Sequence, residues 1–73
     1  MTREVQISTE MIRLGQLLKL AGLIESSGEA KAFLAEVPVT VNGEPEDRRG
    51  RQLHPGDEVR AGDDALRVAA PTE

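Results

Sequence analysis

The chain has 73 residues, enough for one small domain with a modest core, and it contains no cysteine. Disulfides and thiolate metal ligands are therefore excluded, and with one Phe and no Trp or Tyr the core must be aliphatic. The formal net charge of −4, from 9 basic and 13 acidic residues, argues against non-specific binding to polyanions.

The N-terminal segment is polar and mixed in charge, unlike a secretory signal, and no apolar run reaches membrane-spanning length. We therefore expect a soluble cytoplasmic protein with no membrane partner, and we expect a monomer. Residues 1–73 are expected to form a single domain, with a core over about residues 11–70 and a frayed tail at residues 71–73.

The first part of the chain predicts a strand followed by a helix. Val5 and Ile7 alternate with polar neighbours, which indicates a short strand over residues 3–7. Ser8 or Thr9 is well suited to cap the helix that follows. The apolar face of that helix has the i, i+3, i+4, i+7 spacing and consists of Leu14, Leu17, Leu18 and Ala21.

A second helix is predicted directly after the first. Gly22 can end the first helix in a left-handed conformation, and Ser26 with Glu29 has the spacing of a capping box. Pro38 stops the second helix, because the residue before a proline avoids helical geometry. The apolar stripe of this helix consists of Ala30, Phe33, Leu34 and Val37. The two helices are expected to pack as a hairpin.

From residue 39 onward the apolar period changes to two. Val39 and Val41 point to one side of a strand, and Asn42-Gly43 is the strongest short signal for a hairpin turn. Pro45 limits the return strand, because proline cannot donate to a ladder.

Two more strands are predicted near the C-terminus. The run His54-Pro55-Gly56-Asp57 has proline and glycine in the order that a type II turn requires. The strands are expected at residues 58–61 and 66–70, around a turn at residues 62–64.

The start of the second helix has the features of a phosphate site. Ser27 and Gly28 carry little side-chain bulk, and Lys31 lies four residues after Ser27 on the same side of the helix. The unpaired N–H groups and partial positive charge of a helix N-terminus attract an anion. We therefore predict phosphate contact here; the alternative is an ordinary capped helix with a solvated lysine.

Three arginines, Arg48, Arg49 and Arg51, fall within four positions. Guanidinium groups suit phosphate oxygens and also stack on unpaired bases, so we predict RNA contact. Because Glu44, Glu46 and Asp47 lie just upstream, the alternative is a local salt-bridge surface that contributes little.

Other candidate contacts are weaker. Lys19 lies on the polar face of the first helix and is a further predicted RNA contact, whereas Arg13 is as well explained by covering apolar surface with its stem. Asn42 and Gly43 are most simply turn residues, although we include their backbone in the predicted RNA surface. The full set of predicted RNA-binding residues is Lys19, Ser27, Gly28, Lys31, Asn42, Gly43, Arg48, Arg49 and Arg51.

Nothing in the sequence predicts catalysis, a cofactor or a metal site. His54 is the only histidine and precedes a proline, as in an exposed turn. The adjacent pairs Asp57-Glu58 and Asp63-Asp64 diverge in extended backbone, so they make poor paired carboxylates. No nucleophile elbow, P-loop or zinc pattern is present. We therefore expect a non-catalytic protein.

The order of several short motifs resembles the S-four domain, the αL RNA-binding motif of a ribosomal protein, pseudouridine synthases and tyrosyl-tRNA synthetases. In chain order the motifs are Arg13-Leu14, Leu17-Leu18, Gly22, Ser26, Ala30-Lys31 and Val39-Thr40-Val41-Asn42-Gly43. The run Leu17-Leu18-Lys19-Leu20-Ala21-Gly22, with Gly28, Ala30-Lys31 and Arg48-Arg49, is similar to small stand-alone bacterial members (YbcJ-like).

The resemblance implies an α+β fold, with a helix hairpin packed on a small curved antiparallel sheet of three to five strands. It further implies that structured RNA, such as ribosomal RNA, tRNA or a ribosomal particle, is held by the second helix and the following hairpin. A small protein-interaction adaptor without RNA contact is the alternative, motivated by the acidic total and the segment Glu44 to Asp47.

The chain departs from the family pattern at three places. Gly15 stands where many members have an acid, Ser27 stands where many have an arginine, and Val37-Pro38 replaces the usual glycine before the strand. Because that arginine is absent, Lys19 and the Arg48 to Arg51 group must carry more of the expected phosphate contact.

Overall fold

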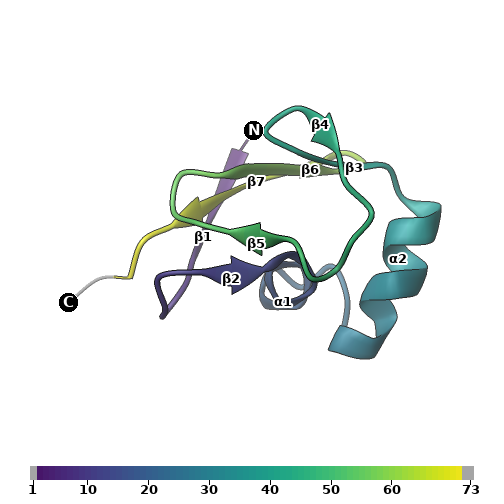
Figure 1. The fold of residues 1–73 in the computed structure, drawn as a ribbon, viewed down its shortest axis with the longest axis horizontal. Helices are drawn as coiled ribbons and strands as arrows, with labels where there is room; N and C mark the ends of the chain where they lie inside the picture. The colour runs from purple at the N-terminus through teal and green to yellow at the C-terminus, as the bar shows by residue number, and fades with distance from the viewer. Residues whose placement is uncertain (1, 72–73) are drawn as a thin grey trace.

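Alternating apolar and polar residues build a five-stranded sheet with the strand order β1-β7-β6-β3-β4 (Figure 1). The computed structural model describes residues 2–71. The strands of this sheet are β1 (Thr2–Gln6), β7 (Asp64–Ala69), β6 (Glu58–Ala61), β3 (Val39–Val41) and β4 (Glu44–Pro45). A separate pair joins β2 (Ile12–Arg13) to β5 (Gln52–Leu53). Two helices pack on the sheet, so the expected α+β class is confirmed.

The sheet is mixed, because β1 runs parallel to β7 while the other neighbours are antiparallel. In the parallel pair Val5 lies opposite Val68, and both side chains are buried in the core. A slip of one residue would turn one of these valines toward solvent, so the apolar alternation fixes the register.

The other face of the sheet is polar and open to solvent. On this face Arg67 Nη2 lies 3.0 Å from Glu58 Oε2 of β6, and Arg67 Nη1 lies 3.9 Å from Glu4 Oε2 of β1. Arg60 of β6 is also exposed here, next to the buried Val59 and Ala61. Exposed ion pairs of this kind stabilise little, so their effect is to keep this face hydrated.

Helix α1 (Leu14–Leu20) buries the leucine face that its spacing predicts. Leu14, Leu17 and Leu18 are completely buried, whereas Lys19 is exposed. The helix ends before Gly22, whose φ is +82°, so the predicted left-handed stop is confirmed.

The prediction that Ser8 or Thr9 caps this helix is wrong. The residue that precedes α1 is Arg13, whose φ of −88° and ψ of 152° are extended. The chain stays extended there because β2 pairs with β5 before the helix begins. The Thr9 hydroxyl instead donates to the Met11 carbonyl at 2.6 Å and closes a local turn.

The second helix begins with a 3-10 turn, Ser27–Glu29, that leads into α2 (Ala30–Glu36). Ser26 precedes it in extended conformation, as the capping-box spacing predicts. The reciprocal box is not formed, because Ser26 Oγ bonds the Glu29 carboxylate at 3.4 Å and makes no side-chain cap to the backbone. The helix ends before Pro38, as expected.

The turns predicted at Asn42-Gly43 and at residues 54–57 are confirmed. Asn42 and Gly43 have φ values of 51° and 86°, the pair of positive angles that a two-residue type I′ hairpin turn needs. At the second turn the Asp57 N–H donates to the His54 carbonyl at 3.0 Å, with Gly56 at a φ of +97°. Of the tail expected at residues 71–73, residues 72 and 73 lie outside the described part of the chain.

One aliphatic core joins both helices and every strand except the exposed β4, as the scarcity of aromatic residues requires. Leu53 of the short strand β5 is completely buried in this core. Its packing therefore holds β5 in place, in addition to the pairing of β5 with β2. The largest fully buried side chains are Leu14, Leu17, Leu18, Leu53, Leu66, Val41, Val59 and Val68.

A buried carboxylate organises the connection between β4 and β5, which we call the arginine loop (residues 46–51). The Glu46 carboxylate, whose side chain is only 5% exposed, accepts hydrogen bonds from the backbone N–H groups of Asp47 and Arg48 and from the guanidinium groups of Arg48 and Arg51. These bonds, first of all that from the Arg48 side chain, lower the pKa of Glu46 to about 2 against the opposing effect of burial.

The arginine loop is bonded to the start of α1. The Leu14 N–H donates to the Arg51 carbonyl at 2.8 Å, and the Gly15 N–H donates to the Arg49 carbonyl at 2.9 Å. Two of the N–H groups that a helix leaves without intrahelical partners are thus satisfied by the loop. The loop and α1 are therefore one structural unit.

We predict that Glu46→Gln lowers stability in a pH-dependent way. The folded-state pKa of about 2 lies below the ordinary glutamate value of 4.5, so the stabilisation is present above pH 4.5 and is lost as the pH falls toward 2. With allowance for solvent around the exposed Arg48, the loss at about pH 7 should be about 1–2 kcal/mol, shrinking at about pH 3. Urea unfolding at the two pH values measures it.

The matched control is Glu44→Gln, which removes an exposed carboxylate two positions earlier. It should leave the free energy of unfolding within about 0.5 kcal/mol of the wild type. Equal destabilisation by Glu46→Gln at both pH values would show that lost shape, rather than lost charge, explains its effect.

Candidate nucleic-acid interface

Three segments distant in the sequence meet at a depression of about 300 Å³, which we call the basic groove. They are the junction of β2 with α1, the 3-10 turn before α2, and the arginine loop. The lining residues are Arg13, Gly15, Gln16, Ser27, Gly28, Arg49 and Gly50. The structure therefore brings together Ser27, Gly28 and Arg49, which the sequence predicts in two separate candidate sites.

Gly15 allows these segments to approach so closely. A Cβ atom at this position would lie 3.3 Å from the Cβ of Ala30 and 3.4 Å from the Cβ of Arg49, which is tighter than ordinary contact. Glycine inside a helix costs about 0.5–1 kcal/mol relative to alanine, and the docking of the loop on α1 explains why it is tolerated here. It also means that no acidic side chain at position 15 is available to neutralise Arg49.

The charge of the basic groove is not compensated locally. Its lining residues include Arg13 and Arg49 and no carboxylate. Both arginines are exposed, and neither forms an ion pair with any residue in the described range 2–71. A negatively charged ligand would therefore meet two free guanidinium groups.

Two glycines in the groove leave its surface open. Gly28 and Gly50 do not have positive φ, and a Cβ at either would meet no close neighbour: the nearest atom to Gly28 is Ser26 Oγ at 3.9 Å, and Gly50 has nothing within 4 Å. Neither backbone conformation nor packing demands glycine at these positions. The absence of side chains does, however, let a ligand approach the backbone.

The helix N-terminus itself contributes less than the sequence predicts. Helix α2 has only 7 residues, and the 3-10 turn before it uses the Glu29 N–H to bond the Ser26 carbonyl at 3.0 Å. The dipole of so short a helix is small. Phosphate contact at Ser27 and Gly28 stays a prediction, and its electrostatic support comes from Arg13 and Arg49.

Arg48 and Arg51 lie next to the basic groove, in a second depression of about 600 Å³ that shares Gly50 with it. Both are engaged by Glu46, at 3.0 Å from Arg48 Nε to Oε2 and 2.8 Å from Arg51 Nη1 to Oε1. The salt-bridge interpretation thus holds for these two arginines but not for Arg49. The Arg48 side chain remains 74% exposed and so is accessible as well as paired.

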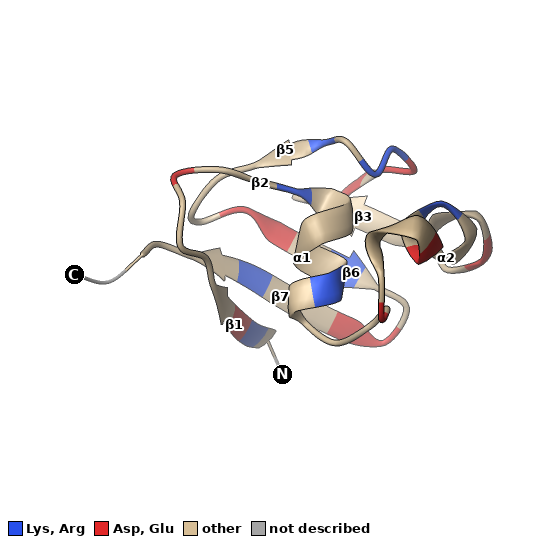
Figure 2. Ribbon diagram, turned by 90° about the horizontal axis from the view of Figure 1, so that it is seen from below, with Lys and Arg blue, Asp and Glu red and all other residues tan. Residues whose placement is uncertain are grey.

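The remaining cations are only partly gathered. Lys19 lines a neighbouring groove that shares Gln16 and Ser27 with the basic groove, whereas Lys31 is exposed on α2 and lines neither. In Figure 2, blue segments lie at the junction of β2 with α1 and before β5, but also on β1, β6 and β7. On β1, Arg3 donates to the Ala21 carbonyl at 2.6 Å, which fixes the end of α1 to the sheet.

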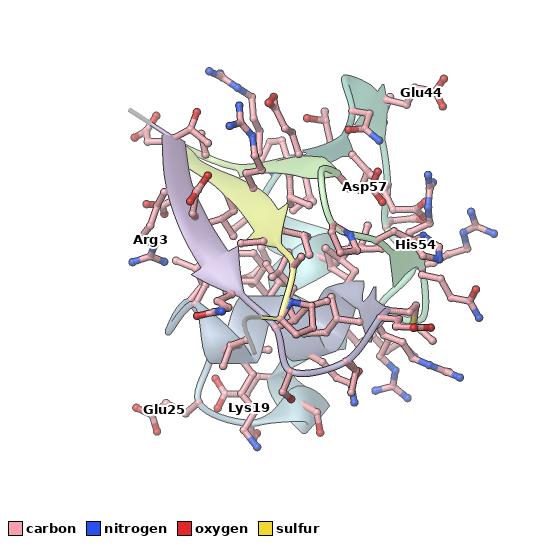
Figure 3. The ribbon with its side chains drawn as sticks, turned by 90° about the vertical axis from the view of Figure 1, so that its left-hand side faces the viewer. Arg3, Lys19, Glu25, Glu44, His54 and Asp57 are labelled. Atoms are coloured by element: carbon pink, nitrogen blue, oxygen red, sulfur yellow. The ribbon has the colours of Figure 1, made fainter. Side chains whose placement is uncertain are left out.

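Asn42 and Gly43 lie at the β3–β4 turn and do not line the basic groove. The Asn42 amide donates to the Asp57 carboxylate at 3.1 Å and accepts the Glu58 N–H at 2.9 Å. Burial acts to raise the pKa of Asp57, but the bonds from the His54 N–H and Asn42 outweigh it, and the pKa is lowered. In Figure 3, Glu44 and Asp57 lie in the upper half of the molecule and Lys19 lies at the bottom. These contacts support a structural role for the turn.

Within residues 2–71 no cluster of three or more His, Cys, Asp or Glu side chains is placed to hold a metal ion. None of the helices in this described range has the length and apolar character needed to cross a bilayer.

Comparison with known proteins identifies the family. Residues 5–69 match the S4 domain. The Bacillus subtilis (strain 168) protein named "Probable ribosome maturation protein RlbA" is 58% identical over 59 residues, which cover 81% of this chain and 83% of the Bacillus protein. The S4 match over residues 5–69 includes the helix pair, the arginine loop and the C-terminal strands. This chain therefore belongs to the S4 domain family, as its motifs predicted.

Proposed function

We propose that this domain is a non-catalytic RNA-binding module that docks phosphates of structured RNA in the basic groove. One observation carries the proposal: Arg13 and Arg49 meet, unpaired, beside the open backbone of Gly28 and Gly50 in a groove without a carboxylate. Arginine forks match phosphate oxygens, and exposed glycine backbone lets the phosphate come close.

The net charge of −4 is compatible with this proposal, because docking depends on the local field. No carboxylate lines the basic groove, and Glu4 and Glu58 lie on the outer face of the sheet, where they pair with Arg67. An overall acidic domain with one basic groove suits a defined binding partner better than any polyanion. We therefore propose that the domain binds a folded RNA selectively.

The name of the Bacillus relative refers to ribosome maturation. Together with the family, this supports ribosomal RNA or a ribosomal particle as the partner, and we propose that class of RNA for this chain, in the cytoplasm. The protein-adaptor alternative loses part of its basis, because Glu46 of the acidic segment is buried and paired inside the arginine loop.

We predict that Arg49→Ala weakens binding to fragmented ribosomal RNA about five- to ten-fold, the effect of losing one charge-assisted phosphate contact. The matched control is Arg60→Ala, which removes the same charge from the exposed outer face of the sheet. Filter binding at low salt measures both affinities, and unfolding curves show that both variants are folded. Equal affinities for the two variants would reject the basic groove.

The salt dependence of binding gives a second prediction. If the groove and its neighbouring cations contact about four phosphates, log affinity should fall against log salt with a slope of about −3. Lys31→Ala should reduce the steepness of the slope by about 1 if RNA extends from Gly28 along α2. An unchanged slope in this variant would confine the interface to α1 and the arginine loop.

A pull-down from lysate tests the adaptor alternative. We expect partners captured by the wild type to be lost after complete nuclease treatment. Protein partners that survive the treatment, and that Arg49→Ala captures equally well, would favour direct protein interaction instead.

A further inference from the structure

A second and larger groove, of about 1050 Å³, lies beside the basic groove, and we call it the aliphatic groove. Its apolar lining is Ile7, Met11, Ile12 and Leu20. Ile7 and Ile12 are 2% and 8% exposed and belong to its base, whereas Leu20 is 55% exposed. Leu20 is the one large apolar side chain exposed within residues 2–71. Neither the core nor the proposed phosphate contacts account for this exposure.

The aliphatic groove is continuous with the basic groove, because Gln16 and Ser27 line both. Lys19 also lines the aliphatic groove and extends away from the ribbon into solvent (Figure 3). A chain of nucleotides whose phosphates lie beside Arg13 and Arg49 would therefore pass directly alongside an apolar surface.

We propose that the aliphatic groove receives an unpaired nucleobase of the RNA, with its flanking phosphates at Lys19 and in the basic groove. The proposal rests on the function proposed above. A base has two apolar faces and a polar edge, and the groove offers the same combination. Leu20 and Ile12 can pack against the face of a base. The Gln16 amide and the Ser27 hydroxyl can form hydrogen bonds with its edge.

Charge complementarity favours a base over a phosphate at this place. Glu10 lines the aliphatic groove but not the basic groove. Its carboxylate would repel a phosphate, yet it can accept a hydrogen bond from the exocyclic amino group or ring N–H of a base. Lys19, in the same groove, provides the cation for the adjoining phosphate. The RNA recognised would then be a structured element that carries at least one unpaired nucleotide.

The test uses the full chain and a pool of fully paired RNA duplexes, half of which carry one additional bulged nucleotide. Bound and unbound fractions are separated and sequenced. The wild type should favour duplexes with the bulged nucleotide about five-fold, toward the lower end of what a base contact contributes. Leu20→Gln should abolish this preference without changing net charge. Because Leu20 is exposed, the variant should fold like the wild type.

Two controls separate the outcomes. Thr2→Gln, at an exposed position on β1, should retain the preference, and Arg49→Ala should lower binding of both duplex classes alike. If Leu20→Gln keeps the preference, or the wild type has none while Arg49→Ala still weakens binding, the nucleobase site is wrong and the phosphate site stands. The same result is expected if the aliphatic groove binds a protein segment instead of a base. If Arg49→Ala binds both classes as well as the wild type, the proposed function itself fails.

Discussion

The hydrogen bonds of the Glu46 carboxylate are the interaction on which the candidate interface depends. This buried carboxylate accepts hydrogen bonds from the guanidinium groups of Arg48 and Arg51 and from two backbone N–H groups. An irregular loop has few backbone bonds of its own, and the carboxylate replaces them. With the loop held in this shape, the Arg49 carbonyl reaches the start of α1, and the Arg49 side chain remains available at the surface.

This arrangement divides the arginines by role. The side chains of Arg48 and Arg51 both bind Glu46. Arg49 contributes only its backbone carbonyl to the contacts that hold the loop. Pairing with Glu46 reduces the positive charge that Arg48 and Arg51 offer to a ligand, but it fixes the position of the neighbouring Arg49. Preorganisation of this kind lowers the entropy lost when a ligand binds. A domain with net negative charge can thus still present a defined cationic groove.

Local signals in the sequence predicted much of the fold. The stop at Gly22, the turn at Asn42-Gly43 and the break at Pro38 depend on the backbone preferences of single residues, so they can be read without knowing the tertiary structure. The pairs β2–β5 and β1–β7 join residues far apart in the chain, and the two-residue strands of the first pair leave no periodicity to detect. The misplaced cap at Ser8 or Thr9 follows from missing that pairing.

The candidate site shows the same division. The sequence identifies Ser27, Gly28 and Arg49 as candidate contacts by their residue types. They lie in one groove because the segments that carry them pack closely at Gly15. In the sequence, Gly15 is only a departure from the family pattern. For this reason the sequence favours Lys19 over Arg13 as a contact, and nothing in it singles out Gly50. Glu46, treated as a nearby acid, could have been recognised only through its burial, which is a property of the folded chain.

The most direct test of this account is a map of backbone amide chemical shifts during titration of the ¹⁵N-labelled chain with ribosomal RNA fragments. The account predicts that the largest changes cluster at Arg13 to Gln16, at Ser27 and Gly28, and at Arg49 and Gly50. Clustering instead on the outer face of the sheet, around Arg60 and Arg67, would contradict it.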